Sequence, residues 1–366
     1  MTLLWCESFE GYEANIRSLL DGGWEETEDS TGVSSLVTTP VRTGTNSLHF
    51  VYYVGSAFDF IRSVPSAPST IGTGFSFYVD ALPSTANRLV MVDFRDNANV
   101  PNLSVLCQTT GDISVFKGDQ SNGTTLTTTS APSIKAGTWN HVEVQATFNG
   151  STGSVEVRVN GVAVISLSGI NTLSDASEVA GASGGAANCG YVGYPGRSNA
   201  SGGAAWVDVY YDDIYTYDML GSYNNDWIGD IKVHPLRPNA DTAQADWTGS
   251  YTDIDDSTVD DEDTYVSAGA PGSPSELTSE FELENLPTTG GTIRAVVVSN
   301  RIRKDTAGAV DYQAGVVSSG VDGKGTTRAL SPVYQRERDI FETDPNSGSP
   351  FTGTEVNNLK LQINRV

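Results

Sequence analysis

Apolar and polar residues alternate most regularly between residues 138 and 167. Residues 142–148 place every second side chain in an apolar series, which is the period of a β-strand with one buried face. Turn-forming residues at 149–153 and the pair Asn160-Gly161 separate two further alternating runs. The pattern predicts a meander of three antiparallel strands.

Shorter runs rich in aromatic and β-branched residues surround this meander, with Pro, Ser, Asn and Gly between them. The spacing near residues 9–20 predicts one short helix, and the Gly-rich stretch 180–203 predicts an exposed loop. The run at 206–217 predicts a further strand. The other predicted strands before residue 140 are 47–53, 74–79, 88–94, 103–108 and 112–116.

A polar stretch at 223–229 predicts a hinge between two domains, residues 1–222 and residues 230–366. The run that follows predicts a strand ended by Pro235 and Pro238. The second domain is then expected to be a smaller β-sandwich. Its predicted elements are strands at 280–286, 292–300, 314–318, 333–341 and 360–366, and a helical turn at 355–359 capped by Thr354.

The composition excludes some partners. With 45 acidic and 21 basic residues, the formal net charge of −24 repels phosphate backbones and anionic headgroups, so we expect no nucleic-acid partner. No apolar segment is long enough to span a bilayer, and the N-terminal sequence lacks a basic signal region, so no membrane insertion is expected. The three cysteines are far apart and are expected to be small buried hydrophobes.

The central meander also resembles a known family. The sequence at 139–142, then Gly153, the valines at 155–159 and the Asn160-Gly161 turn are similar to the meander of laminin G-like and concanavalin A-like jelly rolls. This resemblance implies an all-β, concanavalin-like antiparallel jelly-roll sandwich. The run at 206–217 resembles the closing strand of that family, which implies that it pairs with the N-terminal strand. It does not decide the function, because the fold serves lectins, glycosidases, adhesion modules and virion proteins.

Residues 227–247, 260–266 and 340–345 resemble a group of bacteriophage virion structural proteins. The resemblance implies a non-enzymatic component of the tail or of the capsid surface, made in the bacterial host cytoplasm and located in the virion. Its partners would be other virion proteins, and a homo-oligomer is expected because particles are symmetric.

A glycan-binding host-receptor module is the alternative. Tyr191 and Tyr194 lie in a predicted loop, and exposed tyrosines can stack on a sugar ring of a host surface glycan. Tyrosines in loops more often pack against the protein itself, and this packing role is the interpretation that competes with sugar stacking.

The segment 253–263 is dense in carboxylates, which calcium prefers as ligands. It is no EF-hand, because Thr258 stands where that motif needs glycine. Calcium would be the only cofactor, with Asp253, Asp255, Asp260 and Asp261 as candidate ligands; the competing interpretation is a solvated acidic loop without any cofactor. For Asp208, Asp212 and Asp213, on the predicted closing strand, we expect structural or surface roles.

Glu337, Asp339 and Glu342 match the ExDxxE pattern of one concanavalin-like family of retaining glycosidases. On a strand the first two share a face, and Glu342 joins them only if a bulge shifts the register. The motif lies outside the domain that resembles that fold. A charged edge strand is therefore the preferred interpretation, with a retaining glycosidase as a remote alternative.

Overall fold

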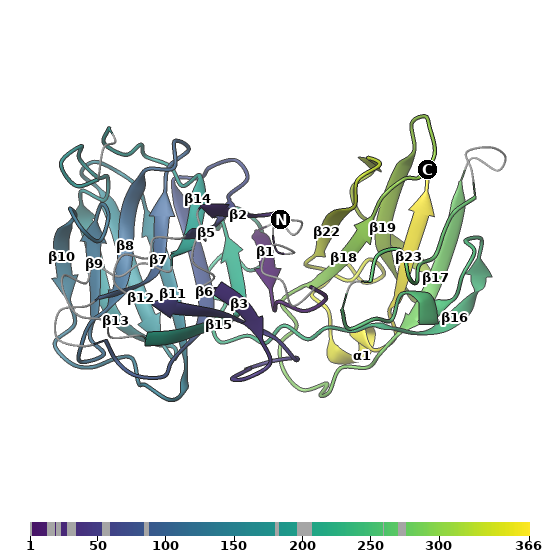
Figure 1. Cartoon of the computed structure of the whole chain (residues 1–366), viewed down its shortest axis with the longest axis horizontal. Helices are drawn as coiled ribbons and strands as arrows, with labels where there is room; N and C mark the ends of the chain where they lie inside the picture. Colours follow the sequence, from purple (N-terminus) through teal and green to yellow (C-terminus); the bar gives the residue numbers. More distant parts are fainter. Residues whose placement is uncertain are drawn as a thin grey trace. The chain divides into compact units, whose positions relative to one another are not determined.

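The computed structural model describes residues 2–12, 19, 23–27, 34–52, 59–83, 88–179, 183–195, 207–258, 260–269 and 276–366. Antiparallel strands dominate these residues (Figure 1). The chain divides into two compact units, one mainly Ala14–Val233 with Thr2–Phe9, the other mainly His234–Val366. No helix in the described ranges is long and apolar enough to cross a membrane.

The first unit is a sandwich of two antiparallel sheets, a jelly-roll fold as expected. The eight-stranded sheet has the order β13 (Val162–Ile170), β12 (Gly153–Val159), β11 (Trp139–Thr147), β6 (Thr70–Val79), β15 (Val207–Tyr217), β4 (Ser47–Tyr52) and β3 (Ser34–Val37), and β1 (Leu3–Glu7) pairs with β15. The seven-stranded sheet has the order β10 (Thr124–Thr128), β9 (Ile113–Lys117), β8 (Pro101–Cys107), β7 (Leu89–Arg95), β14 (Tyr191–Pro195), β5 (Asp59–Ser63) and β2 (Trp24–Thr27).

The predicted meander is confirmed as β11, β12 and β13. Asn160 and Gly161 have φ angles of 50° and 81°, the positive values of a type I′ turn. Val142 and Val144 of β11 are fully buried with the aromatic residues of β6 and β15, so the apolar half of the alternation builds the core between the sheets. Full burial of each such side chain contributes about 1.5–3 kcal/mol.

The other half of the alternation lies on the outer face of the eight-stranded sheet. Two glycines of β6 make room there for tyrosines of β15. A Cβ on Gly74 would lie 2.2 Å from the ring of Tyr215, and one on Gly72 would lie 2.2 Å from the ring of Tyr217. Because no side chain larger than hydrogen fits, these glycines let both rings lie flat across the neighbouring strand.

Several local predictions can be compared with the first unit. The N-terminal strand pairs with the closing strand, as expected, with Cys6 opposite Tyr215. Residues 191–195 form β14 inside the seven-stranded sheet, which corrects the expectation of a loop there. Most of the predicted helix near residues 9–20, and the end of the Gly-rich stretch, fall outside the described residues.

The second unit holds a six-stranded sheet and a two-stranded sheet. The first has the order β16 (Pro238–Ala245), β17 (Leu277–Leu283), β23 (Lys360–Arg365), β19 (Asp311–Ser318) and β20 (Val321–Lys324), with β21 (Arg328–Ala329) paired to β19. The second pairs β18 (Val296–Ile302) with β22 (Gln335–Phe341). Phe281, Tyr312, Phe351, Leu359 and Ile363 lie at the centre of its core.

Two details of residues 227–366 differ from the prediction. Residues 227–237 form no strand, and β16 instead begins at Pro238, because proline lacks the N–H that an interior ladder position must donate. The short helix α1 (Gly353–Val356) is capped by Thr352 rather than Thr354. Thr352 accepts from the backbone N–H of Glu355, whose carboxylate binds back to the Thr352 N–H.

Candidate functional site

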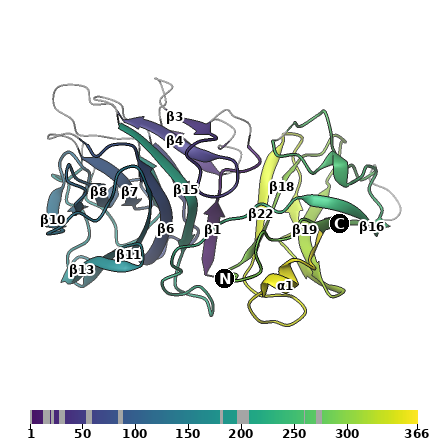
Figure 2. The same ribbon diagram turned by 90° about the horizontal axis from the view of Figure 1, so that it is seen from below.

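A row of aromatic rings crosses four neighbouring strands on the outer face of the eight-stranded sheet. Trp139 of β11 is paired with Tyr78 of β6, Tyr78 with Tyr210 of β15, and Tyr210 with His49 of β4. Directly paired residues share a face, and consecutive ring centroids lie 5.5, 5.6 and 4.6 Å apart. We call these four residues the aromatic row; the strands that carry it lie side by side in Figure 2.

Polar neighbours fix the end of the aromatic row at His49. Its Nε2 lies 2.8 Å from the Asp208 carboxylate, and its Nδ1 lies 3.2 Å from the Ser35 hydroxyl. Burial, followed by the charges of Asp80 and Asp208, raises the pKa of Tyr210 to about 12, so its hydroxyl stays protonated. The row therefore combines aromatic rings, of which Tyr210 is buried, with hydrogen-bonding groups at the His49 end.

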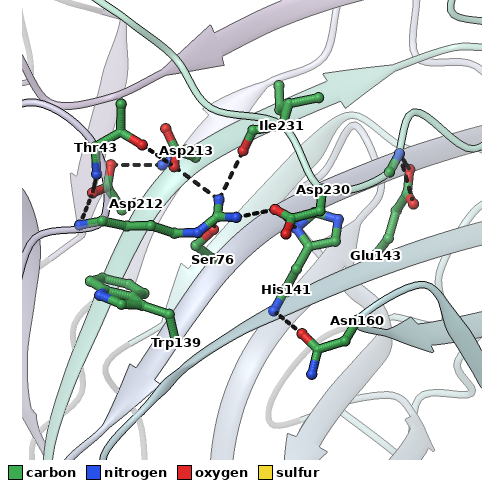
Figure 3. A network of polar contacts seen from close by, with 12 residues as sticks. Thr43, Ser76, Trp139, His141, Glu143, Asn160, Asp212, Asp213, Asp230 and Ile231 are labelled. Atoms are coloured by element: carbon green, nitrogen blue, oxygen red, sulfur yellow. Dashed lines mark hydrogen bonds and ion pairs between the residues drawn. The ribbon is translucent and has the colours of Figure 1, made fainter. Parts of the chain in front are cut away.

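Beside the aromatic row lies a charged network centred on Arg42. Figure 3 labels its partners Ser76, Asp213 and Asp230 near Trp139. The Arg42 guanidinium donates to Ser76 Oγ at 2.6 Å, to Asp213 Oδ2 at 2.9 Å and to the Ile231 carbonyl at 2.8 Å. It also binds the carboxylate of Asp230. The Arg42 side chain is 12% exposed and that of Asp213 is fully buried, so this ion pair is shielded from solvent.

A strand irregularity brings two successive aspartates into this network. In a regular strand Asp212 and Asp213 would point to opposite faces. The register of β15 against β6 shifts after Asp212, and Asp213 has a φ of 49°. Asp212 accepts the backbone N–H of Arg42, Thr43 and Asp213. Burial, and then the Asp213 charge, raise the pKa of Asp212 to about 8.

Residues 226–233 cover this part of the sheet and are called the covering segment below. The backbone N–H groups of Ile228 and Gly229 donate to the Glu143 carboxylate, at 2.8 Å from Ile228 and at 3.2 and 3.3 Å from Gly229. The Tyr215 hydroxyl donates to the Gly229 carbonyl at 2.7 Å. Burial raises the pKa of Glu143, with these hydrogen bonds acting in the opposite direction. The segment is thus held by its backbone.

His141 sits between these groups. Its Nε2 is 3.3 Å from the Tyr215 hydroxyl and its Nδ1 is 3.8 Å from the Asp230 carboxylate. Burial lowers the pKa of His141 to about 4, and burial raises the pKa of Tyr215 well above its usual value. A neutral imidazole, a protonated phenol and the carboxyl of Glu143 can together accept and donate protons.

The candidate residues for sugar stacking lie elsewhere. Tyr194 is fully buried in β14, with its hydroxyl 2.8 Å from that of Thr73, so it presents no ring face to a sugar. The expectation of an exposed ring is corrected there, because the residue lies in a core strand. Tyr191 is half-buried at the start of the same strand, and its role stays a prediction.

Three of the four candidate calcium ligands each contact a different protein group. Asp253 accepts the Ser250 N–H, Asp260 accepts the Thr264 hydroxyl, and Asp261 pairs with Arg301, which lowers its pKa. Asp255 is half-buried. Within the described residues, no three His, Cys, Asp or Glu side chains are grouped so as to hold a metal ion. Calcium binding by this loop stays a prediction.

The first two carboxylates of the ExDxxE motif, Glu337 and Asp339, lie on β22, and Arg328 binds both of them. Arg328 lies 2.6 Å from Glu337 and 2.6 Å from Asp339. The register of β18 with β22 runs without a shift from Gln335 to Phe341, and Glu342 lies just beyond the end of the strand. The bulge that the glycosidase alternative needed is absent from this described strand pair.

Sequence reasoning identified the alternation that builds the outer face but not its use. His141 and Glu143 stand at the polar positions of the predicted strand, and Trp139 precedes its alternating run. Their partners on β4, β6 and β15 come from distant parts of the chain, and only the strand order brings them together. One signal for this surface is present in the sequence: Tyr78, Trp139 and Tyr210 are aromatic residues at strand positions that face away from the core.

The first unit is therefore a jelly-roll sandwich, and the outer face of its eight-stranded sheet carries aromatic and charged side chains. No protein-family model matches the sequence, and no curated protein does either. Among solved structures, 62% of the chain is similar to all of "Cellulose induced protein, Cip1", at 14% identity and a TM-score of 0.41. A second similar structure is alginate lyase Aly36B: the match covers 59% of this chain and 95% of that one, at 15% identity and a TM-score of 0.38. A sialidase matches over 59% of the chain and 19% of its own length, at 10% identity and a TM-score of 0.38.

These likenesses concern the fold. Alginate lyases and sialidases are enzymes by name, so the expectation that this chain is not an enzyme is corrected: its fold is one that enzymes use. Nothing in the comparisons links the chain to a bacteriophage particle, and virion membership gains no support from them.

Proposed function

We propose that this protein binds a glycan on the outer face of the eight-stranded sheet, along the aromatic row. The observation that carries the proposal is the alignment of Trp139, Tyr78, Tyr210 and His49 across four paired strands. Apolar C–H faces of sugars pack on aromatic rings, while sugar hydroxyls bond to groups at the ring edges. Asp208, Ser35 and the Tyr210 hydroxyl supply such groups.

The dimensions favour an oligosaccharide over a single sugar. Three strand spacings of about 4.8 Å make the row about 14 Å long. The net charge of −24 favours an uncharged glycan over a polyanion. The names of the similar structures, which refer to cellulose, alginate and sialidase activity, support a glycan-related role.

The test is binding of the full chain to a panel of cellulose, alginate, sialylated and bacterial-envelope oligosaccharides, followed by calorimetry on those that bind. Trp139→Ala is expected to weaken binding about tenfold or more, because truncating a tryptophan that packs on the ligand commonly costs about 1.4 kcal/mol or more. Tyr265→Ala is the control, since Tyr265 is 56% exposed and belongs to the other unit. Equal affinity of Trp139→Ala and wild type, with both folded, would refute the proposal.

A second candidate is cleavage of the bound glycan, which the contact between His141 and Tyr215 favours. The neutral imidazole can take a proton and the protonated phenol can give one, at positions next to the aromatic row. Incubation with each bound glycan, read as new reducing ends and as new ultraviolet absorbance, tests this activity. Activity retained in His141→Ala would exclude these residues as its source.

The resemblance of residues 227–247 to phage virion proteins supports a setting for the glycan. We propose a bacterial surface glycan as the ligand, which is why envelope oligosaccharides belong in the panel. Binding confined to the other glycans of the panel would count against this setting and leave the site itself in place.

A further inference from the structure

We infer that the covering segment, residues 226–233, is a detachable strap that competes with the glycan for the outer sheet face. This inference rests on the proposed function, since it concerns the regulation of the same site. In the closed state the strap leaves the aromatic row for the ligand and occupies the neighbouring part of the sheet.

The strap is attached through hydrogen bonds between its backbone and side chains of the sheet and of the loop that carries Arg42. One of them runs from the Val233 N–H to the Asp213 carboxylate at 2.8 Å. Residues 226–233 form no strand pairing. Glu143 receives two of their N–H groups, while Tyr215 and Arg42 donate to the carbonyls of Gly229 and Ile231. Sugar hydroxyls can replace each of these bonds, because a hydroxyl both donates and accepts.

The groups beneath the strap are those of a surface, not of a core. Glu143, His141 and Tyr215 are 2%, 4% and 0% exposed, although each is polar or ionisable. Burial of such groups is costly, and a sheet face that is always covered is served better by apolar side chains. The raised pKa of Glu143 and the lowered pKa of His141 reflect that cost. Polar and ionisable side chains are expected at these positions if the sheet face is uncovered during function.

Few side chains hold the strap down. Ile228 is its apolar anchor, at 3% exposure, and Trp227 packs on Arg158 with the guanidinium carbon 3.8 Å from the ring centroid. Asp230 binds Arg42, but its side chain is 52% exposed, so water reaches this contact. An exposed ion pair contributes about 0.2–1 kcal/mol, which makes Asp230 a weak latch.

The strap lies next to the aromatic row. His141 follows Trp139 by two residues on β11, and its partner Ser76 precedes Tyr78 by two on β6. Two residues of a strand span about 7 Å, so a glycan wider than the row reaches the residues under the strap. The apparent affinity for such a ligand is then the affinity of the open form multiplied by the fraction of molecules in which the strap is open.

The experiment compares Asp230→Ala with Asp175→Ala in the full chain. Asp175 is the matched control because it is 67% exposed, belongs to the same unit, pairs with Lys117 at 3.1 Å and carries the same charge. Both variants are first checked for native thermal unfolding. Opening is read without any glycan, from the rate at which diethylpyrocarbonate modifies His141, with His234 of the same chain as the reference.

Asp230→Ala is expected to speed modification of His141 about two- to fivefold and to tighten binding of the panel's best oligosaccharide by the same factor, with Asp175→Ala unchanged in both. An unchanged His141 rate would overturn a detachable strap. A faster rate with unchanged affinity would overturn competition with the glycan. If no glycan binds wild type or variant, the proposed function fails and competition fails with it, while the labelling still reports whether the strap detaches.

Discussion

Replacing Arg42 by methionine tests whether the charged network is a stabilising part of the first unit. The variant removes the guanidinium that pairs with Asp213, whose carboxylate is fully buried. Leaving one partner of a buried ion pair without the other costs about 3–5 kcal/mol. An independent limit follows from protonation: against an ordinary pKa of 3.8, taking up a proton at pH 7 costs about 4 kcal/mol. The two values agree.

The pH dependence sharpens the Arg42→Met experiment. In the variant the native state holds a proton on Asp213 that the unfolded state releases above its ordinary pKa, so the variant's stability falls as pH rises. The loss relative to wild type is therefore expected to shrink to about 2 kcal/mol at pH 5.

Urea unfolding followed by tryptophan fluorescence measures this loss, because every tryptophan except Trp247 precedes residue 234 and reports on the first unit. Arg158→Met is the control: Arg158 is 29% exposed on the same sheet face, and its loss should cost about 1 kcal/mol. A loss below about 1 kcal/mol at pH 7 for Arg42→Met, or one that does not change between pH 7 and pH 5, would refute the reasoning.

Three further predictions concern stability. Gly74→Ala is expected to destabilise the first unit by about 1–3 kcal/mol, because the new Cβ meets the Tyr215 ring, whereas Gly150→Ala, with its nearest atom at 4.0 Å, should be near neutral; urea midpoints compare them. His141 has a pKa near 4 when folded against 6.5 ordinarily, so the unfolded state binds the extra proton and wild-type stability should fall as pH drops from 6.5 to 4, by at most about 3 kcal/mol. His141→Gln should remove that part of the pH profile, and an unchanged profile would contradict it. Thr352→Ala should destabilise the second unit by about 1 kcal/mol through loss of the cap, seen as a lower thermal midpoint of that unit's transition, and an unaltered midpoint would count against the capping role.

Local patterns in the sequence were enough to predict the meander and the all-β class. The alternation after Trp139 and the Asn160-Gly161 turn depend on neighbours a few residues apart, and the structure has both where they were expected. Pairing of the N-terminal strand with β15 needed the family resemblance as well, because such a contact joins the two ends of a domain.

The candidate site could not be assembled from such patterns. Asp213 reaches the outer face only through an irregularity of β15, and no turn residue in the sequence marks it. Tyr194 lies among glycines, which suggested a loop, yet it pairs with Phe60 in the interior of a sheet. Tertiary contacts overrode local composition in both cases. The covering segment was predicted as hinge and strand for the same reason: its hydrogen-bond partners lie on another strand.

The two faces of the eight-stranded sheet separate stability from function. Val142 and Val144 are fully buried in the core between the sheets. His141 and Glu143, between them in sequence, point outward, where they bind or face the strap. Detachment of the strap would therefore expose polar groups that water can satisfy, while the apolar layer between the sheets stays closed. Because successive side chains of a strand point to opposite faces, the nine residues of β11 both pack the core of the sandwich and present polar groups on the outer face, which the strap can uncover.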